Sequence, residues 1–152
     1  MADSYTSVAA ADTYHMARGN ELWGNADGTT REVALVRACD YLERGYGRLW
    51  QGARTTLEQR LSFPRFGIGN LRSTEIPSWM IEAQCEAALL ELKRPGCLSE
   101  SWNEGGSLAG EREGEISKSY RPGIETLRKF PPIYGILAPH IRNPSQVKME
   151  RA

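Results

Sequence analysis

The chain has 152 residues, of which 40% are hydrophobic and 25% charged, a balance typical of a single globular domain. Its 19 Lys and Arg equal its 19 Asp and Glu, so the formal net charge is zero. Proteins dedicated to nucleic acid usually carry a basic excess, which is absent here. No apolar run approaches the roughly 18 residues that span a bilayer, and the N-terminus lacks the features of a signal peptide. We therefore expect a cytosolic protein without membrane contact.

The first predicted helix follows Ser7, which suits the N-cap position, and ends before Gly19-Asn20. One face of this helix collects the apolar residues Val8, Ala10, Ala11, Tyr14 and Ala17. His15 is predicted at the edge of that face. No nucleophile with an orienting partner lies nearby in sequence, which favours packing over a reactive site for Tyr14 and His15.

The second predicted helix begins at Thr29, with Glu32 completing a capping box, and ends at the glycines 45 and 47. Its apolar side chains recur at helical spacing, at Leu35, Ala38, Cys39, Leu42 and Tyr46. We expect this face to pack against the rest of a helical bundle.

Two further helices follow in the sequence. A short one is predicted from Thr55, with Glu58 at the capping-box position and Pro64 as its terminator. A long one starts with Pro77 in its first turn and stops at Pro95-Gly96. Its sequence is apolar on nearly every side, which predicts the buried centre of the bundle.

Beyond this helix the helical periodicity fades. Residues 97–129 contain glycine clusters, with one alternating stretch, EISKSY, that favours a short strand. The predicted fold is thus mainly α: a bundle of about four helices, a long irregular loop or short β-arm, and an extended tail. The expected divisions are a helical core at 1–94, the loop or arm at 95–129 and a docking tail at 130–152.

The sequence offers no constellation for catalysis, a metal or a cofactor. The glycine-rich segment EGGSLAGEREGE lacks the Lys-Ser/Thr of a P-loop and carries four glutamates that would repel phosphate. The two histidines have no ligand-spaced companions, and three cysteines without paired spacing indicate reduced, buried thiols. We expect neither an enzyme nor a cofactor-binding protein.

One segment has the composition of a nucleic-acid site. In YLERGYGRLWQGAR, Tyr46 and Trp50 alternate with Arg48 and Arg54, as in surfaces that stack bases beside guanidinium groups. Tyr46 also belongs to the apolar face of the second helix, and Trp50 follows a glycine turn where an aromatic often closes a core. Packing is therefore the favoured interpretation of the two aromatics, and single-strand binding the alternative.

Six short motifs together resemble a family of small tailed-phage proteins, often labelled DnaT-like single-stranded-DNA-binding proteins and similar to head-to-tail adaptors of the phage neck. The resemblance covers roughly residues 3–94. The motifs are Asp3-Ser4-Tyr5, Tyr14 to Gly19, Ala38 to Leu42, Trp50 to Arg54, Gln59 to Arg65 and Ile76-Pro77.

The adaptor resemblance implies a structural virion protein made in the host cytoplasm and placed in the head-tail neck. It implies a ring of about twelve copies between the portal protein and the tail terminator or stopper. Double-stranded DNA would pass through this ring without being held, which suits a neutral chain. The alternative is a single-stranded-DNA-binding accessory protein of phage replication that uses Tyr46, Arg48, Trp50 and Arg54. A general assembly protein outside the neck is a third, weaker reading.

The tail completes the adaptor hypothesis. Its apolar segment is expected to dock on the portal or on a neighbouring subunit, and removal of residues 130–152 should then leave a folded monomer. The expected interface residues are Phe130, Pro131, Pro132, Ile133, Tyr134, Ile136 and Leu137.

Overall fold

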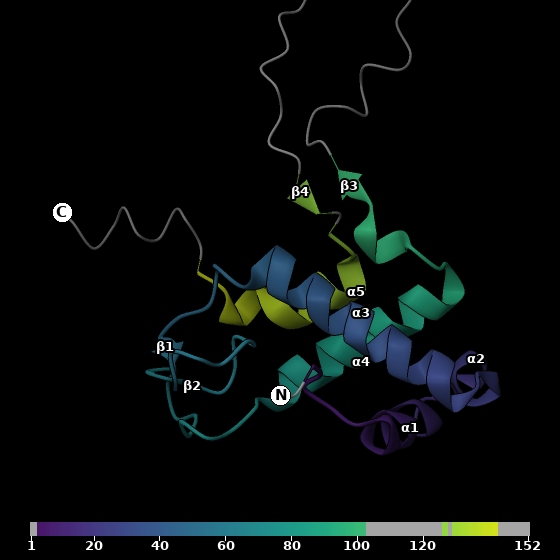
Figure 1. Cartoon of the computed structure of the whole chain (residues 1–152), viewed down its shortest axis with the longest axis horizontal. Coiled ribbons are helices and arrows are strands. Elements are labelled where there is room, and N and C mark those ends of the chain that lie inside the picture. Colours follow the sequence, from purple (N-terminus) through teal and green to yellow (C-terminus); the bar gives the residue numbers. More distant parts are fainter. Residues whose placement is uncertain (1–2, 103–125, 128, 143–152) are drawn as a thin grey trace, which may run out of the picture.

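The computed structural model describes residues 3–102, 126–127 and 129–142, and within them the protein is mainly helical, as predicted (Figure 1). The helices are α1 (Val8–Met16), α2 (Glu21–Asn25), α3 (Gly28–Tyr46), α4 (Ser78–Lys93) and α5 (Pro131–Leu137), with 3-10 turns η1 (Cys97–Ser99) and η3 (Ala138–His140). Two antiparallel pairs of two-residue strands accompany them: β1 (Ala53–Arg54) with β2 (Arg65–Phe66), and β3 (Ser101–Trp102) with β4 (Thr126–Leu127).

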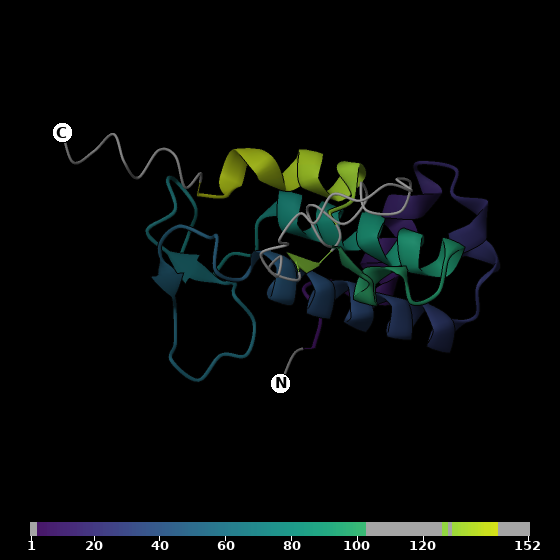
Figure 2. The ribbon, with the colours of Figure 1, turned by 90° about the horizontal axis from the view of Figure 1, so that it is seen from above.

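Helix α4 forms the centre of the bundle, with α3 on one side and α5 on the other (Figure 2). Half of its residues are buried, including Met80, Ala83, Ala87 and Ala88, none of which exposes any side-chain surface. The prediction of a buried central helix is therefore confirmed. Small alanines on several faces let α3 and α5 approach α4 closely.

Helix α3 buries the whole apolar face predicted for it. Its start differs from the prediction, because Asp27 rather than Thr29 is the N-cap. The Asp27 carboxylate accepts hydrogen bonds from the Thr30 backbone N–H at 2.9 Å and from the Thr30 hydroxyl at 2.7 Å. These bonds lower the pKa of Asp27, and Gly28 permits the helix to start two residues earlier than the capping-box pattern suggested.

Helix α1 has the predicted N-cap, since the Ser7 hydroxyl accepts from the Ala10 N–H at 3.2 Å. Its buried face differs from the prediction: Ala11 and His15 are fully buried, and Ala10 and Ala17 are exposed. The His15 ring lies 4.4 Å from the Trp23 ring between centroids, and burial lowers its pKa. Trp23 belongs to α2, a five-residue helix too short to be visible as a periodic pattern.

The helix predicted from Thr55 is absent. Residues 55–64 instead form an irregular loop that joins β1 to β2. The Gln59 amide organises it, because its oxygen accepts from Thr56 N–H at 3.1 Å and its nitrogen donates to the carbonyls of Leu61 and Pro64. These side-chain bonds replace the backbone ladder that a helix would need.

The C-terminal segment belongs to the core of the described chain. In α5, Ile133 and Leu137 are fully buried against α4, so they are not free for a partner, contrary to the docking-tail hypothesis. Helix α5 therefore packs on the bundle at 1–94, and the division of the chain into a core, an arm and a docking tail stays a prediction. The predicted strand EISKSY lies in residues 103–125, outside the described residues, as do residues 143–152.

Replacing Leu137 by Ala should remove about 2–5 kcal/mol from the free energy of unfolding, since it leaves a cavity between α4 and α5. Urea denaturation followed by circular dichroism measures the change. Tyr134→Ala is the matched control: this side chain on the same helix is 40% exposed, and its loss should cost less than about 1 kcal/mol. Equal stabilities for the wild type and Leu137→Ala would place α5 outside the core.

Candidate nucleic-acid interface

The two aromatic residues predicted to stack on bases are core residues. Tyr46 is 2% exposed and Trp50 is 3% exposed. Their rings stack on each other with centroids 6.2 Å apart, and Trp50 also meets Phe63 edge-on at 5.5 Å. Burial of both rings favours the packing interpretation, and their direct contact with single-stranded DNA, the alternative, stays a prediction.

The two predicted arginines are exposed. Arg48 follows the end of α3, and Arg54 lies on β1. The β1–β2 register sets Arg54 directly opposite Arg65 of β2. Like charges directly opposite one another on paired strands repel, so this pairing needs a stabilising influence from elsewhere.

Arg65 is 8% exposed and holds the turns around it together. Its guanidinium donates to the carbonyls of Gln51 at 2.9 Å, Gly52 at 2.8 Å and Ser62 at 3.2 Å. All three acceptors are neutral. Burial and the neighbouring guanidiniums of Arg54 and Arg142 lower the pKa of Arg65. The charge of Glu43 partly opposes this lowering of the Arg65 pKa, but the hydrogen bonds of the guanidinium go only to neutral carbonyls.

Arg142 reaches this region from the other end of the chain. Its backbone N–H donates to the Leu49 carbonyl at 2.8 Å, beside a bridge between Trp50 and Ile141. The His140 ring lies flat on Trp79, with centroids 4.1 Å apart and planes 4° apart. These contacts hold residues 138–142 against the bundle. No local sequence pattern indicates this long-range packing.

Arg54, Arg65 and Arg142 are called the arginine cluster below. None of the three forms an ion pair with a carboxylate in the part of the chain that the structure describes. Other arginines do, as in the pairs Arg31–Asp12 at 3.2 Å and Arg37–Glu91 at 2.7 Å. The cluster can therefore accept an anion, and guanidinium groups match the geometry of phosphate oxygens.

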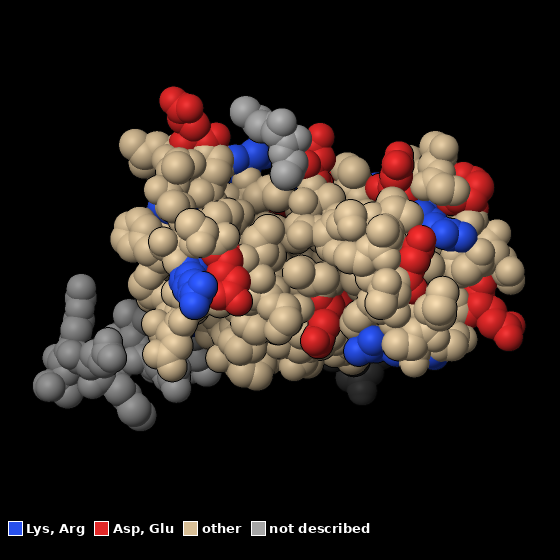
Figure 3. Space-filling view, turned by 90° about the horizontal axis from the view of Figure 1, so that it is seen from below, with Lys and Arg blue, Asp and Glu red and all other residues tan. Residues whose placement is uncertain are grey.

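The cluster belongs to a basic end of an otherwise neutral molecule. Residues 48–75, called the β-lobe, contain five arginines against two glutamates. Residues 8–33, which form α1, α2 and the start of α3, contain two arginines against four carboxylates. Figures 1 and 2 place these two segments at opposite ends of the long axis. Acidic side chains are numerous toward the α1–α2 end in Figure 3, so the zero net charge conceals a charge separation.

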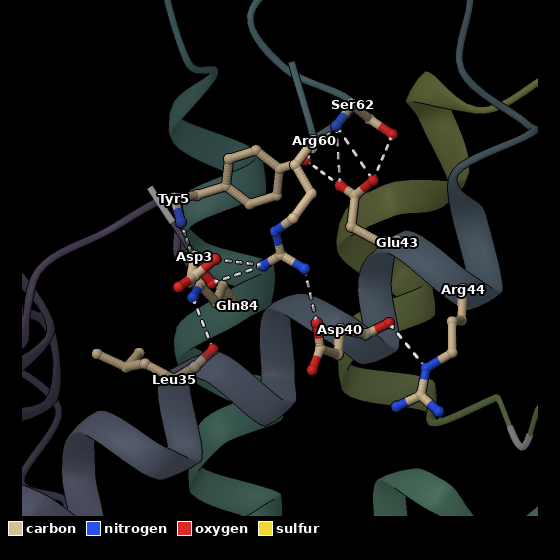
Figure 4. A network of polar contacts seen from close by, with 9 residues as sticks. All are labelled: Asp3, Tyr5, Leu35, Asp40, Glu43, Arg44, Arg60, Ser62 and Gln84. Atoms are coloured by element: carbon tan, nitrogen blue, oxygen red, sulfur yellow. Dashed lines mark hydrogen bonds and ion pairs between the residues drawn. The ribbon is translucent and has the colours of Figure 1, made fainter. Parts of the chain in front are cut away.

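A polar network fixes the β-lobe on the bundle (Figure 4). The Glu43 carboxylate of α3 accepts from the Ser62 N–H at 3.1 Å, from the Ser62 hydroxyl at 2.8 Å and from the Tyr5 hydroxyl. Burial and the Glu43 charge raise the pKa of Tyr5, which keeps its hydroxyl a donor. Arg60 bridges Asp3 and Asp40 nearby.

The predicted portal or subunit interface is only partly accessible. Phe130 and Ile136 are half-buried and pack on the core, where Phe130 meets Tyr41 edge-on at 5.9 Å. Pro131, Pro132 and Tyr134 are exposed along the outer side of α5. Only these three keep the accessibility that an interface requires, and their contact with a partner stays a prediction.

The described residues contain no group of three or more His, Cys, Asp or Glu placed to hold a metal ion. The three cysteines are buried. Burial, together with the negative charge of Glu43 for the first and Glu86 for the second, raises the pKa of Cys39 and Cys85 to about 12, so these thiols stay protonated at neutral pH. None of the described helices has the length and apolar character to cross a bilayer.

A family model described as "Putative DnaT-like ssDNA binding protein" matches residues 1–152. The chain therefore belongs to this family. Comparison with curated proteins gives no match, and comparison with solved structures gives none. The resemblance to the DnaT-like family is thus confirmed. The similarity to head-to-tail adaptors of the phage neck stays a prediction.

Arg65→Lys should lower the free energy of unfolding by about 1–3 kcal/mol, because a lysine cannot satisfy three carbonyls that the guanidinium fork satisfies together. Urea denaturation measures this loss. Arg54→Lys, on the partner strand and exposed, is the matched control and should leave the midpoint unchanged. If Arg65→Lys is as stable as the wild type, the turns of the β-lobe do not depend on the three hydrogen bonds that the guanidinium donates.

Proposed function

We propose that this member of the DnaT-like family binds single-stranded DNA through the arginine cluster of the β-lobe. The observation that carries the proposal is the set of three neighbouring guanidiniums without a carboxylate partner among the described residues. Phosphate groups would neutralise the repulsion between Arg54 and Arg65 across the strand pair. The family description supports the same ligand.

The three arginines have different parts in this proposal. Arg65 is held by carbonyls, so it supplies a fixed positive charge at no further cost in side-chain entropy. Arg54 and Arg142 are exposed and free to follow a phosphate backbone. Binding of this kind releases counterions and is therefore weakened by salt and largely independent of sequence.

Discrimination against duplex DNA requires an accessible aromatic face. Among the aromatic residues of the β-lobe, Trp50 and Phe63 are buried, and Phe66 on β2 is 52% exposed. Phe66 is thus the side chain on which an unpaired base can stack. It replaces Tyr46 and Trp50 in the role that the sequence suggested for them.

Fluorescence anisotropy with a labelled oligo-dT tests the proposal. The double variant Arg54→Ala/Arg142→Ala should weaken binding at least tenfold and reduce the slope of log affinity against log salt by about 1.4, which corresponds to two phosphate contacts at about 0.7 each. Arg18→Ala, in the opposite end of the molecule, is the control and should change neither quantity. An unchanged salt slope in the double variant would rule out the arginine cluster as the DNA site.

A second function, a head-to-tail adaptor in the phage neck, is favoured by a different observation. The chain has zero net charge and its conspicuous aromatics are core residues, as suits a conduit that must not hold DNA. In this proposal the protein is structural and non-enzymatic, and forms a ring that meets the portal protein on one side and the terminator or stopper on the other. The exposed side of α5, at Pro131, Pro132 and Tyr134, is the part of the predicted interface that can reach a partner.

Electron microscopy of lysates separates the two functions. If a phage that encodes this chain loses its gene, the adaptor function predicts filled or leaking heads lying beside separate tails. The DNA-binding function predicts intact virions at reduced yield. Complementation with the Arg54→Ala/Arg142→Ala variant is the control, because it should restore head-tail joining only if the adaptor function does not use the arginine cluster.

A further inference from the structure

We infer that this chain associates head to tail with a second copy of itself, the β-lobe of one copy docking on the α1–α2 end of the next. The inference is independent of DNA binding, and it would supply the self-association that the adaptor proposal requires. It rests on three features of the described residues: exposed apolar side chains, a cavity and the charge separation.

The exposed apolar side chains concentrate at the two ends of the molecule. On the β-lobe, Leu57 is completely exposed and Phe66 is 52% exposed. At the other end, Met16 is 81% exposed, with Leu22 and Val33 about half as exposed. A leucine side chain held fully in water loses the favourable transfer that burial would bring, so a partner that covers it gains binding energy.

A cavity of about 380 Å³ lies between α1, α2 and α3 at the acidic end, and it is larger than a leucine side chain. Met16 and Trp23 give it apolar walls, and Glu21 lies at the same site. Gly19 and Gly24 line it as well, and a side chain added at either would meet no atom within 4 Å, so the glycines leave room at the rim.

The two ends are complementary in charge. Arg60 is paired with Asp3 and Asp40, so the other four arginines of the β-lobe exceed its two glutamates by two positive charges, and residues 8–33 have an excess of two negative charges. Arg54 lacks an ion-pair partner within the described residues, and Glu21 is exposed at the cavity. Complementary charges around an apolar contact steer association and fix its orientation.

The placement of the two surfaces determines the kind of assembly. Because they lie at opposite ends of the long axis (Figures 1 and 2), the contact is heterologous: each copy uses a different surface toward each neighbour. Such contacts propagate into rings when the rotation closes and into open chains when it does not.

Sedimentation velocity of the full chain, up to about 100 μM, tests the inference. The wild type should form concentration-dependent oligomers that salt weakens. Leu57→Asp and Met16→Asp should each be monomeric, because each removes one of the two surfaces. Val36→Asp, a half-exposed site on the outer side of α3, is the matched control and should associate as the wild type does.

Mixing the two monomeric variants gives the decisive result. Leu57→Asp keeps the cavity end and Met16→Asp keeps the β-lobe, so a mixture should form a one-to-one dimer that grows no further. Glu21→Arg should also weaken wild-type association. A wild type that stays monomeric, or a mixture that stays monomeric, overturns the inference. Anisotropy with oligo-dT on Met16→Asp keeps the proposals apart, because this variant changes the end opposite the arginine cluster and should bind DNA as the wild type does at concentrations where the wild type is monomeric.

Discussion

The Glu43 carboxylate is the contact on which the position of the β-lobe relative to the helical bundle depends. It joins three segments distant in sequence, because it belongs to α3 and accepts from Ser62 of the β-lobe and from Tyr5 near the N-terminus. Tyr5 in turn donates its backbone N–H to Gln84 of α4. The β-lobe has little regular structure of its own, so without this acceptor the hydroxyls of Ser62 and Tyr5 would lose the carboxylate that joins them, and the lobe its fixed position.

This anchoring explains how an irregular segment can present a fixed set of charges. Residues 55–64 have no backbone ladder, and their shape comes from side-chain bonds by Gln59 and Arg65 to carbonyls. Arg65 therefore has a structural role and an electrostatic one. Its three hydrogen-bond acceptors are neutral carbonyls, so its positive charge adds to that of the exposed Arg54 opposite it on β1.

The sequence predicted those features that depend on periodicity and local capping, and missed those that depend on long-range contacts. The apolar face of α3, the all-round burial of α4 and the Ser7 cap follow from spacing alone. The capping box at Thr55 failed because Gln59 offered the backbone competing bonds. For Trp50 the arginines nearby in sequence left base stacking as an alternative to packing, and its spatial neighbours are Phe63 and Trp79. The cluster itself joins Arg54 to Arg142 across 88 positions, which no local pattern can indicate.

The two ligands proposed for the β-lobe compete for the same charges. Phosphates of single-stranded DNA and carboxylates of a neighbouring copy would each neutralise Arg54, so a subunit interface that covers this side chain would reduce DNA affinity. The apolar contact distinguishes the DNA from the neighbouring copy. Leu57 can be buried in a cavity of a protein, but it has no aromatic face on which a base could stack. For either ligand the attraction has the same origin: a neutral chain that separates its charges along one axis exposes a basic end, and such an end would attract an anionic partner.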